Sequence, residues 1–179
     1  GVGYLIGRPD ATTAAVADLR AAEAARDVTQ IGELTALARR TRDQVTGVLT
    51  ELHAAVNAGR IAPAEQVTAW QKTMKQATDA FADPPSGTTA TNVARGGLRS
   101  SVTALAVAVD GYAAARAVAP AQRAELMTLV ERQAGAAVTT WSVAAAQLDQ
   151  INIDAGYGHQ HVHLEVQGDE GAFTFDGHD

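Results

Sequence analysis

The hydrophobic periodicity of this chain changes once, near residue 154, and that change constrains the fold more than any other feature. From Ala11 to Ile153, apolar side chains recur at steps of three and four residues, as on one face of an α-helix. From His159 onward they alternate with polar side chains, as in a β-strand. The sequence therefore predicts a helical bundle over residues 10–154 and a β tail over residues 155–179.

Capping and breaking residues divide the helical part into five predicted segments. Asp10 is a suitable N-cap, and Asp27 with Gln30 forms a capping pair that predicts a break between a short first helix and a long second one; the alternative is that the helix simply continues. Asn57-Ala58-Gly59 ends the second helix. The remaining helices are expected at residues 63–81, 92–117 and 120–153. This order predicts an elongated antiparallel bundle of four principal helices plus a shorter first helix.

The composition predicts a core of small side chains. Apolar residues make up 46% of the chain but aromatic residues only 4%, which favours closely packed helices over a large sheet. Trp70 and Trp141 lie within the apolar stripes, so we expect both in the core. The pair Gly96-Gly97 either weakens the start of its helix or permits a close helix crossing there. No apolar run reaches the 18 or so residues that a membrane-spanning helix needs.

The net charge of −6 comes entirely from the tail. Residues 1–153 hold 14 basic and 14 acidic side chains, whereas residues 154–179 hold six acidic side chains and no lysine or arginine. The tail also contains four of the five histidines. A neutral body with an acidic, histidine-rich tail attracts cations and repels nucleic acid. Nucleic-acid binding is therefore excluded as the main function.

The chain contains no cysteine, which excludes disulfides, thiolate metal sites and cysteine nucleophiles.

The N-terminal segment is apolar: it reads Gly1-Val2-Gly3-Tyr4-Leu5-Ile6-Gly7 and precedes Arg8-Pro9. We interpret residues 1–9 as a linker or as the remnant of a membrane anchor or signal segment. This predicts an extracytoplasmic protein, tethered or exported, and the composition resembles exported, alanine-rich helical proteins of high-GC bacteria.

The tail is predicted to form a β-hairpin. The first strand covers His159–Val166, residues 167–171 have turn chemistry, and Ala172–Asp176 alternates again. Val162, Leu164 and Val166 share one face of the first strand. Because an isolated hairpin is only marginally stable in water, this apolar face is expected to dock on the helices or on a partner chain.

The opposite face of the first strand carries the one group of residues with evident chemistry. His159, His161, His163 and Glu165 point the same way, with neighbours about 6.6 Å apart. Adjacent imidazoles at that spacing can converge on one ion, and a turn carboxylate or the terminal His178-Asp179 can complete the site. Imidazole with carboxylate suits zinc, copper(II) or nickel. The alternative is that these histidines are simply the polar side of an edge strand.

The other candidate residues indicate a functional site less strongly. His53 lies beside the apolar Leu52 and Val56 and is predicted to be a boundary residue rather than a ligand. Arg39, Arg40 and Arg42 are interpreted as a solvated helix face or an ion-pair strip. The sequence contains no Glu-x-x-His pair, zinc-protease motif, phosphate loop or nucleophile elbow.

Two functions remain open. The first is a non-enzymatic, extracytoplasmic bundle that binds a divalent transition metal through His159, His161, His163, Glu165 and His178. The second is an interaction or sensor ectodomain, in which the long helices form a homodimer or bind a protein partner and the hairpin is structural. An enzyme is not expected, because no acid–base pair or nucleophile can be assembled from these residues.

Overall fold

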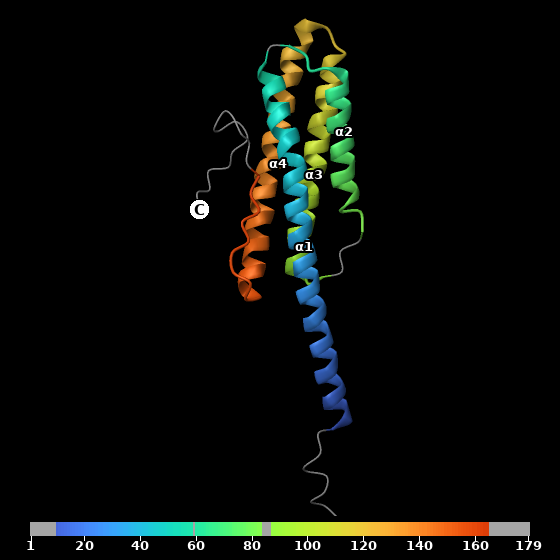
Figure 1. Cartoon of the computed structure of the whole chain (residues 1–179), viewed down its shortest axis with the longest axis vertical. Coiled ribbons are helices and arrows are strands. Elements are labelled where there is room, and N and C mark those ends of the chain that lie inside the picture. Colours follow the sequence, from blue (N-terminus) through green and yellow to red (C-terminus); the bar gives the residue numbers. More distant parts are fainter. Residues whose placement is uncertain (1–9, 59, 84–86, 165–179) are drawn as a thin grey trace, which may run out of the picture.

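The computed structural model describes residues 10–58, 60–83 and 87–164, and within them it is a bundle of four helices (Figure 1). Consecutive helices run antiparallel, and α3 packs most extensively against α4. The helices are α1 (Ala11–Asn57), α2 (Ala64–Asp79), α3 (Thr89–Arg116) and α4 (Pro120–Asp154). The predicted antiparallel bundle is confirmed. None of the described helices is long and apolar enough to cross a membrane.

The predicted break in the first helix is wrong. Asp27 and Gln30 both lie inside α1, which continues without interruption for 47 residues. No glycine or proline lies between Asp10 and Ile31, and the alanine-rich sequence favours propagation of the helix over a new cap. The bundle therefore has four helices and no separate short first helix. At 1.5 Å per residue, α1 is about 70 Å long.

The starts of three helices follow local signals. Asp10 caps α1, since its side chain accepts a hydrogen bond from Thr12 N. Thr88 accepts a hydrogen bond from Thr91 N, so α3 begins three residues before the predicted start at Asn92. Pro120 opens α4 as predicted.

The core lies between the helices and uses small side chains to bring α3 and α4 together. Trp70 and Trp141 are buried, as predicted. A Cβ atom placed on Gly97 would lie only 2.7 Å from Ala144 Cβ, whereas one on Gly96 would meet nothing within 4 Å. Gly97 therefore permits the close crossing of α3 and α4. Gly96 has no such role.

The first part of α1 projects beyond the bundle (Figure 1). Every residue from 11 to 26 is exposed, and Ile31 is the first buried side chain of the helix. Two apolar side chains of the projecting part, Val16 and Leu19, are 42% and 57% exposed. We call residues 11–26 the projecting helix.

Candidate functional site

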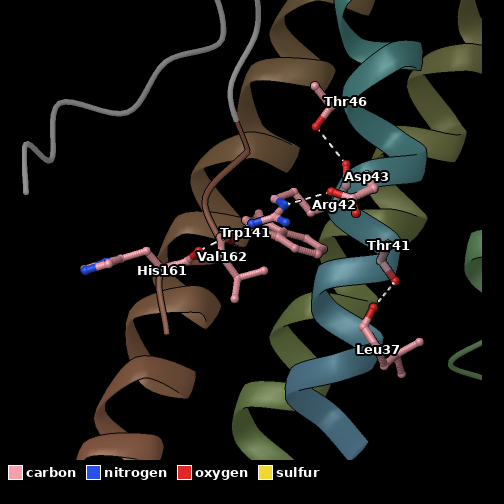
Figure 2. A network of polar contacts seen from close by, with 8 residues as sticks. All are labelled: Leu37, Thr41, Arg42, Asp43, Thr46, Trp141, His161 and Val162. Carbon is pink, nitrogen blue, oxygen red and sulfur yellow. Dashed lines mark hydrogen bonds and ion pairs between the residues drawn. The ribbon is translucent and has the colours of Figure 1, made fainter. Parts of the chain in front are cut away.

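The chain reverses direction after α4. Gly156 and Gly158 both adopt positive φ angles, 87° and 70°, which side chains other than glycine rarely tolerate. Residues 157–164 then run back along α4, and side chains of both α4 and α1 contact them (Figure 2). We call these residues the C-terminal strap. They are extended, but no strand is present in the parts of the chain that the structure describes.

The strap is fixed by hydrogen bonds to side chains of α4. Asp149 accepts two of them, one from Gln160 N at 2.6 Å and one involving His159 Nδ1, which lies 2.7 Å from Asp149 Oδ2. Trp141 Nε1 donates to the carbonyl oxygen of Val162 at 2.6 Å (Figure 2). These contacts lie on one side of α4, so the strap follows that helix.

Arginines of α1 hold the other side of the strap. Arg39 donates to the side-chain oxygen of Gln160, and Arg42 Nη1 donates to the carbonyl oxygen of His161 at 3.4 Å (Figure 2). Arg42 also pairs with Asp43 at 3.1 Å. The Arg42–Asp43 pair agrees with the interpretation of these arginines as an ion-pair strip, but the contacts of Arg39 and Arg42 with the strap were not predicted.

Side chains of the strap alternate between the core and solvent, as the sequence pattern predicts. Val162 is 1% exposed and Leu164 is partly buried against the core. His159, His161 and His163 are all exposed. The apolar face thus docks on the helices, and the three histidines form an outward-facing imidazole row. The predicted turn and second strand, with Glu165 and His178, lie outside the described residues, so the hairpin stays a prediction.

The rings of the imidazole row are stacked. The His159 and His161 centroids are 5.3 Å apart with planes 4° from parallel, and the His161 and His163 centroids are 5.7 Å apart at 24°. In this arrangement the described residues include no group of three His, Cys, Asp or Glu side chains that converges on one ion. Zinc–nitrogen bonds of about 2.1 Å require the ring nitrogens of two ligands to lie within about 4 Å of each other. Rotation of the exposed side chains is needed to bring them there.

Asp149 sets the tautomer of His159. Partial burial raises the pKa of Asp149. The hydrogen bonds from His159 and from Gln160 N, together with the positive charge of nearby histidines, lower it by more, so this pKa lies below its ordinary value. The carboxylate is therefore ionised at neutral pH and can only accept, so the proton of their hydrogen bond lies on Nδ1 of His159. In a neutral imidazole this leaves Nε2 with a free lone pair. Metal-binding histidines are commonly oriented in this way by a carboxylate.

His53 lies away from the strap and is buried in the contact between α1 and α4. Its Nδ1 is 3.2 Å from Asn57 Nδ2 and 3.6 Å from Glu131 Oε1. It is more deeply buried than the predicted boundary position. Sequence reasoning also missed Asp149, although the reversal at Gly156 and Gly158 is a signal that places His159 beside the last turns of α4.

Comparison with known proteins supplies no family for this chain: neither family models, nor curated proteins, nor solved structures give a match.

Proposed function

We propose that this protein binds a divalent transition metal, zinc, copper(II) or nickel, through the imidazole row of its C-terminal strap. The observation that carries the proposal is the pairing of Asp149 with His159 beside two further exposed imidazoles. An ordinary polar strand face requires no carboxylate behind one of its rings. Asp149 favours the tautomer of His159 whose Nε2 is free to bind a metal.

His161 and His163 are the proposed central ligands, with Nε2 of His159 or the carboxylate of Glu165 as the third. A turn or terminal side chain, such as His178, is the proposed fourth ligand. The predicted hairpin belongs to this proposal, because a return strand would bring residues 172–176 beside the row. Metal bound here would crosslink side chains of the strap, and no chemical step is assigned to the ion.

Isothermal titration calorimetry of the full-length protein without a histidine tag tests this function. Zinc, copper(II) and nickel are titrated into the wild type and into the double variant His161→Ala/His163→Ala. We expect saturable heat for the wild type with at least one of these metals and about tenfold weaker binding, or none, for the double variant. His53→Ala is the matched control and keeps wild-type affinity. Equal heats for the wild type and the double variant would overturn the proposal.

A second function, an interaction or sensor ectodomain, is favoured by the projecting helix. Its exposed Val16 and Leu19 have no apolar neighbour in the described bundle that covers them, which is a common property of helices that pair with another chain. Sedimentation of the wild type as a dimer, and of Leu19→Glu as a monomer, would support this function. A monomeric wild type at all concentrations would count against a homodimer. An extracytoplasmic location is part of both proposals.

A further inference from the structure

The strap contacts side chains of α1 on one side and of α4 on the other, and we call the space between these two helices the α1–α4 groove. Beyond the strap, toward the loop that joins α1 to α2, the groove opens into a cavity of about 740 Å³. We call it the upper cavity. Its lining combines apolar side chains of Val56, Ile61 and Met127 with Arg60, Arg123 and Glu131.

The strap points along this groove toward the upper cavity. Gln160 contacts Arg39, and the next residue, His161, contacts Arg42, so the strap advances in the same direction as α1. That direction leads toward the C-terminal end of α1, where Val56 lines the cavity. On α4 the strap likewise passes from Asp149 to Trp141, toward the start of the helix.

The length of chain beyond Val162 matches the distance to the cavity. Along α4, Met127 lies 14 residues before Trp141, or about 21 Å at 1.5 Å per residue. In an extended chain, Gly168 lies six residues after Val162, or about 20 Å. By the same reckoning Arg123 is about 27 Å from Trp141, and Glu170 is about 26 Å from Val162.

The charges are complementary. Residues 165–179 carry five acidic side chains and no lysine or arginine. Arg123 donates to the carbonyl oxygens of Ala115 and Val118, at 3.2 and 2.9 Å, which fixes its guanidinium without neutralising it. Within the described part of the chain, neither Arg60 nor Arg123 forms an ion pair with a carboxylate. Glu131, the acidic member of the lining, lies beside His53 instead.

We propose that residues 165–171 continue along the α1–α4 groove and bring the carboxylates of Asp169 and Glu170 to Arg60 and Arg123 in the upper cavity. The acidic tail is then an intramolecular ligand of the bundle, and it covers the apolar lining of the cavity. This proposal requires no metal. A hairpin turn at residues 167–171 would place Asp169 and Glu170 at its tip, about as far from Val162 as Gly168, so the arginine side chains would have to span the rest of the distance.

The absence of native cysteine makes a disulfide-trapping test clean. In the test pair, Gly168→Cys is combined with Met127→Cys, which places the second thiol in the cavity. In the control pair, it is combined with Leu129→Cys, which places the second thiol at a similar height on the exposed side of α4, where Leu129 is 51% exposed. Oxidation is followed by mass spectrometry at low protein concentration and with EDTA present. Docking predicts that the Met127 pair closes about tenfold faster or more, because a docked tail raises the effective thiol concentration. Equal rates for the two pairs would overturn the proposal.

The role of charge is tested in the tail, where substitutions leave the helices intact. Asp169→Asn/Glu170→Gln is compared with Asp176→Asn/Asp179→Asn, which removes the same charge farther along the tail. We expect the first change to slow closure of the Met127 pair severalfold and the second to leave it unchanged. Equal effects would contradict docking at Arg60 and Arg123. A covalent dimer in place of the intramolecular disulfide would show a second copy in the cavity and would also overturn the proposal.

If Met127→Cys disturbs packing, as judged by circular dichroism, Thr128→Cys supplies a second thiol in the cavity lining. Thr128 is exposed, so this change removes no core side chain. It is expected to close faster than the Leu129 pair. A rate equal to that of the Leu129 pair would contradict docking just as directly.

Discussion

Replacing Val162 by alanine tests whether the C-terminal strap is part of the folded bundle. Val162 is 1% exposed and belongs to the core. Removing two methyl-sized groups costs about 1.6 kcal/mol in transfer free energy, at 0.8 kcal/mol per group. A residual cavity of roughly 50 Å³ adds about 1.2 kcal/mol if the site does not collapse. The expected loss in the free energy of unfolding is therefore about 2–3 kcal/mol.

This loss has an upper bound, which is the free energy with which the strap docks. If the free energy of strap docking is smaller than the calculated cost of the substitution, Val162→Ala releases the strap. The helical bundle then stays folded with the strap detached. Trp141 reports this event, because its indole N–H donates to the Val162 carbonyl oxygen and would exchange with solvent once the strap is released.

Urea unfolding followed by circular dichroism measures the change in stability, and NMR measures exchange of the Trp141 indole N–H. His163→Ala is the matched control, since it truncates the next residue of the strap on its exposed face. It is expected to change stability by less than about 0.5 kcal/mol. Equal effects of the two substitutions on unfolding, together with unchanged indole exchange, would refute the packing of Val162 in the core.

Three further predictions follow from other contacts. Because the pKa of Asp149 is lowered in the folded protein, its contribution to strap docking is present above about pH 4 and is lost as pH falls through the folded-state pKa. Exchange of the Gln160 amide should accelerate there, and Asp149→Asn should remove this pH dependence; an unchanged profile would contradict the role of the carboxylate. Gly97→Ala should destabilise the bundle by about 1–3 kcal/mol through overpacking, whereas Gly96→Ala should be neutral or slightly stabilising, as measured by urea unfolding; similar effects of both would disprove the close crossing. A peptide of residues 155–179 should be disordered by NMR without metal, and stable hairpin signals from it would show that docking is not required.

The helices and the inside–outside pattern of the strap could be predicted from the sequence because both depend on local order. The stripe that contains Trp141 follows the 3.6-residue period, and alternation assigns Val162 to the core and His161 to solvent. Aspartate, proline and threonine residues mark the N-terminal ends of the four described helices. The break at Asp27 was wrong because a capping pair is a weak signal when no glycine or proline interrupts the helix.

The partners of the strap could not be predicted in the same way, because they depend on contacts between distant residues. Arg39 and Arg42 precede Gln160 and His161 by about 120 residues, and nothing in their local sequence distinguishes them from solvated arginines. Asp149 is nearer, but only the reversal at two positive-φ glycines brings it to His159. The upper cavity likewise depends on residues that are distant in the sequence, since it is lined by the end of α1, the loop after it and the start of α4.

The central claim, that the outward imidazole row binds a divalent metal, is tested most directly by NMR of the histidine ring nitrogens during a zinc titration. The account predicts that the ring nitrogens of His161 and His163, together with Nε2 of His159, shift and saturate at one zinc per chain, while those of His53 do not change. The shifts should weaken as the solution is acidified, because protons compete with the metal for the imidazole nitrogens. Ring signals of the row that stay unchanged at several equivalents of zinc would contradict the claim.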